Sequence, residues 1–203
     1  MTASNSFFLR NRLTVVLIAL ISIIPFSFAW YLAKNPHLVK DLHKGNYGHL
    51  ITPAKPIDYA ELFQTPITAG ESLPEIKGRW VMVQVSTESV CNDACKETVQ
   101  KTGRIRLMLN KEIPRVRRVL LFPGHADAAA TEELAKLDPT LQMAGMSESL
   151  QKRLQESVGG PIPEGAVLLL DPLANLMMWY DPNFDPYGLL RDLQKLLRIS
   201  QIG

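Results

Sequence analysis

The longest apolar run of the chain lies near its N-terminus, at residues 13–33. It reads LTVVLIALISIIPFSFAWYLA and carries no acidic or basic side chain. A helix rises about 1.5 Å per residue, so a run of this length spans the roughly 30 Å of hydrocarbon in a bilayer. Trp30 and Tyr31 stand at one end, where aromatic side chains prefer the headgroup region. We therefore expect one transmembrane helix here.

A cleaved secretory signal is the alternative for this segment, because Arg10 and Arg12 precede the apolar run. The apolar part of a signal is usually about 7 to 15 residues long, which favours an uncleaved anchor. The basic N-terminus favours a cytoplasmic position for residues 1–12, although lysines also follow the span. We expect a bacterial inner membrane protein whose soluble part faces the periplasm. In the alternative, a mitochondrial inner membrane protein, residues 1–12 would be too short for a presequence.

Beyond the span, the pattern changes twice. Residues 34–72 are punctuated by glycine and proline and show no sustained period, which predicts a linker that also wraps the start of the domain. Residues 73–203 alternate between short apolar runs and amphipathic stretches, and their number suits one domain.

The first half of this domain predicts a strand, a helix and a second strand. Residues 79–85 (RWVMVQV) and 116–122 (VRRVLLF) are short, apolar and rich in β-branched side chains, as in buried strands. Residues 93–110 have helical periodicity. The stripe of this helix consists of Ala94, Thr98, Thr102, Ile105 and Leu109.

The second half predicts two short helices, a hairpin and a final helix. Residues 131–137 and 147–158 are the short helices, with Thr131 and Ser147 as capping residues. The hairpin pairs residues 166–170 with 176–180. The final helix buries Leu189, Leu190, Leu193, Leu196 and Leu197, and we expect Arg191, Asp192, Gln194, Lys195 and Arg198 to point to water.

This order of elements is that of an α/β, thioredoxin-like fold, in which a βαβ half and a ββα half share one mixed sheet flanked by helices. One N-terminal transmembrane helix precedes it.

Charge and motifs exclude several classes of function. With 22 basic and 20 acidic residues the net charge is +2, which argues against a nucleic-acid partner. The basic stretch between residues 104 and 118 is expected to form a solvated helix face and strand edge. The sequence contains no P-loop, no metal-hydrolase spacing and no Gly-x-Ser-x-Gly motif.

Candidate chemistry rests on the only two cysteines, Cys91 and Cys95. They follow the first strand and enter the first helix, where a parallel βα unit presents its functional loop. A helix N-terminus stabilises a thiolate, so the pair is a candidate for thiol–disulfide catalysis or for holding a soft metal. A plain structural disulfide and a pair of inert buried thiols remain the alternatives.

Three short motifs resemble the Sco family. They are Gly78-Arg79-Trp80 before the first strand, the Cys-x-x-x-Cys pair after it, and Leu168-Leu169-Leu170-Asp171-Pro172 in the hairpin. The resemblance covers approximately residues 70 to 200. It implies a membrane-anchored, thioredoxin-like protein that assists copper insertion into cytochrome c oxidase, with copper as cofactor or cargo and an oxidase subunit or copper-assembly protein as partner.

The chain departs from the Sco pattern at two places. Lys96 follows the second cysteine, where the family commonly has proline. The family's third copper ligand is a histidine shortly before the hairpin turn, and residues 159–167 contain none. His125 follows the second strand, so its loop is expected at the same sheet edge as Cys91. It is a candidate third metal ligand beside Cys91 and Cys95 or a candidate proton-transfer partner, and an exposed loop histidine without such a role is the alternative.

Three functions follow as alternatives. The first is thiol–disulfide exchange that keeps the cysteines of a partner reduced, and the second is carriage of Cu(I) by the two cysteines. The third is a non-catalytic interaction factor in respiratory complex assembly, with a structural disulfide.

Overall fold

The computed structural model describes residues 3–35, 45–62, 65–66 and 76–200. It divides into two units, Met1–Gly45 and Asn46–Gly203.

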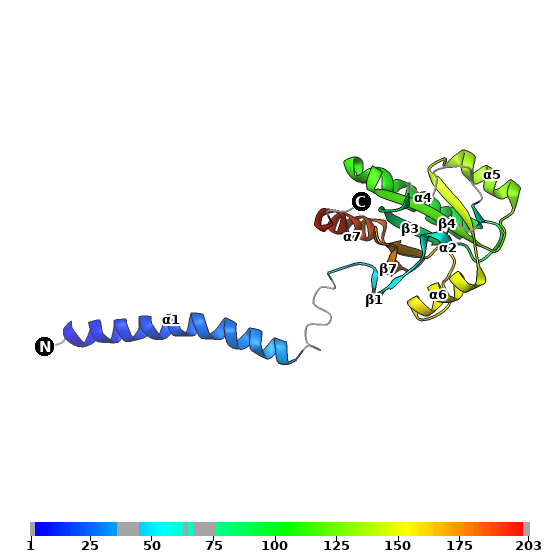
Figure 1. Cartoon of the computed structure of the whole chain (residues 1–203). Coiled ribbons are helices and arrows are strands. Elements are labelled where there is room, and N and C mark those ends of the chain that lie inside the picture. Colours follow the sequence, from blue (N-terminus) through cyan, green and yellow to red (C-terminus); the bar gives the residue numbers. More distant parts are fainter. Residues whose placement is uncertain (1–2, 36–44, 63–64, 67–75, 201–203) are drawn as a thin grey trace. The chain divides into compact units, whose positions relative to one another are not determined.

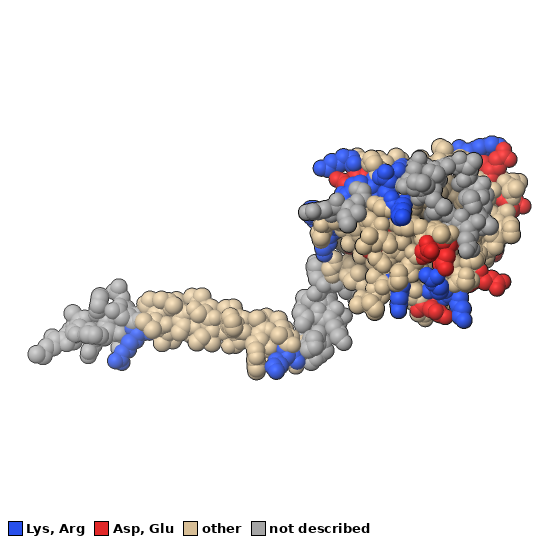
Figure 2. All heavy atoms as spheres, viewed as in Figure 1, with Lys and Arg blue, Asp and Glu red and all other residues tan. Residues whose placement is uncertain are grey.

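The first unit contains one long helix, α1 (Ala3–Lys34), with Pro25 inside it. Its segment Thr14–Lys34 is long and apolar enough to cross a membrane, which agrees to within one residue with the predicted span. The apolar side chains are exposed; Phe26, for example, is 82% accessible. Figure 2 shows no charged residue along the stretch between the basic residues at its two ends. Such a surface suits lipid.

The second unit is built on a seven-stranded sheet in the order β1-β7-β6-β3-β4-β5-β2 (Figure 1). Strands β3, β4 and β5 run parallel, whereas β6 pairs antiparallel with both β3 and β7. The strands are β1 (His49–Pro56), β2 (Thr65–Pro66), β3 (Trp80–Val85), β4 (Val116–Pro123), β5 (Leu141–Met146), β6 (Val167–Leu170) and β7 (Asn175–Tyr180). The helices of this unit are α2 (Tyr59–Leu62), α4 (Asp93–Met108), the 3₁₀ helix η2 (Asn110–Arg115), α5 (Ala128–Leu137), α6 (Glu148–Val158) and α7 (Pro186–Ile199).

Helices cover both faces of the sheet, which explains why β3 is buried along its whole length. Because successive side chains alternate, Val81 and Val83 pack toward α2 and α6, and Met82 packs toward α4 and α7. Helix α5 lies on the same face as α4, where Leu134 joins the cluster around the cysteines. Figure 1 shows α6 on the side of the sheet opposite α4 and α5.

The strands and helices predicted for residues 79–122 and 166–198 are present. The sequence pattern did not reveal β1 or β5. Strand β1 lies inside the segment expected to be a linker and pairs antiparallel with β7, so the compact unit begins at Asn46 rather than at residue 73. Strand β5 (LQMAGM) lacks β-branched and aromatic residues, but it is buried throughout because it pairs with β4 and β2.

The residue that caps α5 differs from the prediction. Asp127, not Thr131, caps α5, because its carboxylate accepts a hydrogen bond from the N–H of Ala130. Thr131 lies one turn later, where it is buried. Ser147 caps α6 as predicted, by accepting from the N–H of Leu150.

Asp192 of α7 does not point to water; it is 5% exposed. Its carboxylate accepts hydrogen bonds from the backbone N–H groups of Tyr47 (2.7 Å) and Gly48 (3.0 Å) and from the hydroxyl of Tyr180 (3.0 Å). Burial, together with the charge of Asp192, raises the pKa of Tyr180. The bonds to Tyr47 and Gly48 attach the segment that precedes β1 to α7, and the bond from Tyr180 attaches β7 to the same helix. Together they satisfy the buried carboxylate, which would be costly to bury without hydrogen-bond partners.

Candidate functional site: a disulfide at the start of helix α4

The two cysteines form a disulfide where β3 passes into α4. Cys91 precedes the helix and Cys95 lies in its first turn, with 5.2 Å between their Cα atoms. Asn92 caps the helix, since its side-chain oxygen accepts a hydrogen bond from the N–H of Cys95 at 3.1 Å. The sequence pattern therefore placed the pair at the correct junction, although only Cys95 is helical.

The disulfide is buried in an apolar environment. Each cysteine is 2% exposed, and both belong to a cluster that includes Leu120, Phe122 and Leu134. Such surroundings favour neutral thiols after reduction, whereas the free N–H groups at the helix start favour a thiolate. The two influences oppose each other at this pair.

The loop between β3 and the disulfide is held to its neighbours by hydrogen bonds. The N–H of Ser86 donates to the carbonyl of Leu121 at 2.8 Å, and the carbonyl of Ser89 accepts from the N–H of Asp127 at 2.9 Å. Residues 87–90 are nevertheless exposed, and the apolar side chain of Val90 is 44% accessible. The loop thus offers a surface next to the buried sulfurs.

Glu164 is a site residue that the sequence reasoning missed. Its Oε2 atom accepts hydrogen bonds from the backbone N–H and from the hydroxyl of Thr87, both at 2.5 Å. Its Oε1 atom is buried and has no hydrogen-bond partner in the described part of the chain. Glu164 lies in residues 159–167, the stretch where the Sco resemblance implied a histidine. A carboxylate from that stretch therefore reaches the cysteine loop.

The structure brings the loop of His125 beside the cysteine loop, as the parallel topology predicted. The contact is made by Asp127, whose N–H donates to Ser89, and the side chain of His125 is exposed. Among the residues that the structure describes, no three His, Cys, Asp or Glu side chains gather as a metal site would require.

In the disulfide form, the two cysteines do not fit copper, because sulfurs bonded to each other are not thiolate ligands. Reduction would provide two soft thiolates, the ligand type that selects Cu(I).

A buried polar network lies below α4. Arg118 of β4 is 1% exposed, so this part of the basic stretch is not solvated as expected. Its guanidinium donates to the carbonyl of Val99 at 3.1 Å and to the hydroxyl of Thr140 at 3.1 Å, and it forms an ion pair with Asp138. A signal for this burial was present in the sequence, because residue 118 falls inside a predicted buried strand.

The ion pair changes the acidity of Asp138. Burial alone would raise the pKa of this carboxyl group, but hydrogen bonds from Arg118 and Thr140, together with the guanidinium charge, outweigh burial and hold the pKa below its ordinary value. Asp138 is therefore ionised at neutral pH.

A mixed sheet of this order, with a Cys-x-x-x-Cys disulfide at the β3–α4 junction, defines a thioredoxin-like domain. Residues 80–200 match the family model described as "Transmembrane-like, thioredoxin-like, C-terminal domain", and the chain belongs to this family. No curated protein matches the sequence.

Solved structures of Sco proteins resemble this chain. Apo Sco1 of Thermus thermophilus superposes with a TM-score of 0.54 at 18% identity, covering 74% of this chain and 96% of that one. Arabidopsis thaliana ScoI with copper bound gives 0.48 at 19% identity, covering 63% and 89%. Yeast Sco1 gives 0.49 at 12% identity, covering 62% and 87%. The similarity to the Thermus protein shows a shared fold, which confirms the thioredoxin-like fold and the Sco resemblance at that level.

Proposed function

We propose that this chain is a membrane-anchored thiol–disulfide protein that assists assembly of cytochrome c oxidase. The observation that carries the proposal is the Cys91–Cys95 disulfide at the N-terminus of α4. The fold shared with Thermus Sco1 and the membership in a transmembrane-like, thioredoxin-like family support it.

The proposed reaction starts from the reduced pair. One cysteine thiolate attacks a disulfide of the client and forms a mixed disulfide, while one client sulfur leaves as a thiol after taking up a proton. The second cysteine then attacks the mixed disulfide. The client leaves with two thiols, and the protein is left with the Cys91–Cys95 bond seen in the structure.

Trapping tests this proposal. Cys91→Ser and Cys95→Ser variants of the full chain lack one partner of the exchange, so one of them should accumulate a mixed disulfide with a client in membranes. Non-reducing electrophoresis followed by mass spectrometry identifies that adduct. The matched control is the variant in which both cysteines are serine. If neither single variant forms an adduct above this control, thiol exchange is not its function.

Burial of both sulfurs favours a second candidate, a non-catalytic assembly factor with a structural disulfide. A variant with serine at both positions would then keep full oxidase assembly in cells, provided that it folds. Loss of assembly with an unchanged circular dichroism spectrum would instead support a role for sulfur chemistry.

Titration of the reduced full chain with Cu(I) against a competing chelator distinguishes copper delivery from thiol exchange and from a structural role of the disulfide. Retention of one equivalent, lost on Cys91→Ser or Cys95→Ser, would support Cys91 and Cys95 as Cu(I) ligands. The same titration of His125→Ala tests the candidate third ligand. No retention at all would exclude carriage.

The proposed location is the bacterial inner membrane, with residues 1–12 in the cytoplasm and the domain in the periplasm. The apolar α1 helix and the description of the family support the single-pass anchor. Accessibility of the domain to protease added to spheroplasts tests the orientation, because a cytoplasmic domain would be protected.

A further inference from the structure

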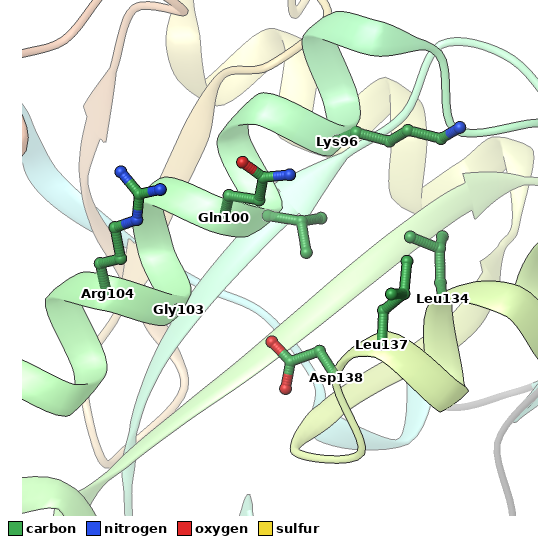
Figure 3. Close-up of a pocket in the computed structure, with 8 residues that line it drawn as sticks. Lys96, Gln100, Gly103, Arg104, Leu134, Leu137 and Asp138 are labelled. Carbon is green, nitrogen blue, oxygen red and sulfur yellow. The ribbon is translucent and has the colours of Figure 1, made fainter.

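A groove lies between α4 and α5 (Figure 3). Two of its lining residues, Val99 and Leu134, belong to the same buried cluster as Cys91 and Cys95. Its volume is about 340 Å³. Its first residue along α4 is Lys96, which follows Cys95 in the chain. Its lining consists of Lys96, Val99, Gln100, Gly103, Arg104, Leu134, Leu137 and Asp138.

One wall of the groove is cationic. Lys96, Gln100 and Arg104 follow one another at intervals of four residues on α4, so they form a stripe along one face of the helix. All three are exposed, and in the described part of the chain neither Lys96 nor Arg104 has an ion-pair partner. The one acidic residue of the lining, Asp138, is neutralised by Arg118. The groove therefore presents net positive charge.

The floor and the opposite wall are apolar. Val99 and Leu134 are 5% exposed and close the bottom of the groove, whereas Leu137 is 73% exposed on α5. A leucine so exposed beside two unpaired cations is suited to a ligand that combines apolar and acidic groups.

We infer that this groove binds an extended, acidic segment of the client protein, and that it thereby places the client beside Cys91 and Cys95. That the acidic segment belongs to a client of the disulfide rests on the proposed function. Binding of an acidic segment in the groove does not depend on that function. Lys96 and Arg104 are separated by about 12 Å along α4. An extended chain covers this distance in about four residues, and residues two and four apart share one face. The matching segment has two acidic residues four positions apart and an apolar residue midway between them.

A binding measurement tests the inference without thiol chemistry. The full chain, oxidised and in detergent, is titrated against a fluorescent peptide that has aspartates four positions apart and a leucine midway. We expect saturable binding that weakens with salt, because exposed charge pairs are screened. Replacing both aspartates by asparagine, or Lys96 and Arg104 by glutamine, should weaken binding about tenfold, since each exposed pair contributes modestly.

The matched control variant carries Lys111→Gln and Lys152→Gln. It has the same change in charge at two exposed lysines of η2 and α6, away from the groove, and should bind the peptide as the unmodified chain does. Leu137→Ser tests the apolar wall and should also weaken binding. All these side chains are exposed, so folding is preserved, and a thermal melt verifies it.

Equal binding by the unmodified chain and the Lys96/Arg104 variant would overturn the inference, as would the absence of saturable binding. The two proposals fail separately. Peptide binding without trapped adducts would refute thiol exchange and leave the groove as a docking site, whereas trapped adducts without peptide binding would refute the groove alone.

Discussion

We expect Glu164 to restrain the opening of the loop between β3 and the disulfide. It holds Thr87 by two hydrogen bonds to a carboxylate oxygen, and such charge-assisted bonds are stronger than neutral ones. Because both sulfurs are buried, a reductant reaches them only after some local opening. Glu164→Ala should therefore speed reduction of the disulfide by dithiothreitol. We expect an increase of about fivefold, because the two hydrogen bonds that are lost are partly exposed to solvent and each contributes modestly.

Thiol labelling and mass spectrometry of the full chain measure this rate. The control is Glu156→Ala, an exposed residue of α6 for which no change is expected. Equal rates for all three proteins would mean that Glu164 does not restrain access to the sulfurs.

We predict that position 103 must be glycine, because the side chain of Arg118 passes close to α4 at this point. A Cβ atom at this position would lie 3.1 Å from Nη1 of Arg118 and 3.5 Å from a carboxylate oxygen of Asp138. The guanidinium is fixed by its bonds to Val99, Thr140 and Asp138, so it cannot move away cheaply. Gly103→Ala should lower the free energy of unfolding by about 1 kcal/mol, although alanine is otherwise better in a helix by a similar amount.

Urea denaturation of the full chain in detergent, followed by tryptophan fluorescence, measures this change. Gly160→Ala is the control, because its added Cβ meets nothing within 4 Å. A stabilised Gly103→Ala variant would show that Arg118 does give way.

At the scale of single residues, the position of the cysteines was predictable from the sequence, whereas the hydrogen bonds of Glu164 and Asp192 were not. Cys91 and Cys95 are marked by their position between a strand and a helix. Glu164 and Asp192 act through partners far away in the chain, Thr87 and Tyr47, and no local pattern reports such contacts.

The ion pair between Arg118 of β4 and Asp138, the residue that follows α5, makes the stability of the domain depend on pH. The lowered pKa means that the ionised form stabilises the folded state above the unfolded value of about 3.9, and that this stabilisation is lost as the pH falls through the folded pKa. The unmodified chain should therefore lose stability on acidification below about pH 4. Asp138→Asn should be less stable at pH 7 and lose less over the same acidic window.

Thermal melts of both proteins between neutral pH and pH 3 make this comparison. Parallel pH profiles would contradict a contribution from Asp138. The side chain of Asp138 is 25% exposed, which keeps the expected effect smaller than that of a fully buried pair.

Asp192 joins three elements: the segment before β1, strand β7 and helix α7. Replacing it with alanine would leave the N–H groups of Tyr47 and Gly48 and the hydroxyl of Tyr180 without their acceptor. We expect Asp192→Ala to lower the free energy of unfolding by about 2 kcal/mol and to speed hydrogen exchange of residues 46–50.

Asp181→Asn is the matched control, since Asp181 makes an exposed hydrogen bond with His49 and its replacement should change stability by less than about 0.5 kcal/mol. Exchange that is equally fast in both variants would argue against the role of Asp192.

Elements were predictable where local pattern and tertiary environment agree. The apolar run of β3 and the leucine stripe of α7 are strong local signals. Strand β5 has a weak strand pattern and exists because β4 and β2 pair with it. Strand β1, mostly exposed and broken by prolines, exists because it pairs with β7.

The whole chain is expected to remain in the membrane through α1. Substituting Ile21 and Ile24 by arginine places two charges near the middle of the span, at a cost of about 2.5 to 3.5 kcal/mol each. Extraction of membranes with carbonate should then release the variant and retain the unmodified chain. The control replaces both residues with leucine and should stay in the membrane. Retention of the arginine variant would mean that another part of the chain binds the membrane.

The hydrogen bonds of Asp192 have a mechanical consequence. A pull on the polypeptide that precedes Asn46 reaches the domain first at Tyr47 and Gly48, whose N–H groups are clamped to α7. In the sheet, β7 and β6 separate β1 from β3, the strand that leads to the cysteines. Tension from a membrane tether would thus be borne by the C-terminal helix and the edge strand, and the loop between β3 and the disulfide would be shielded from it.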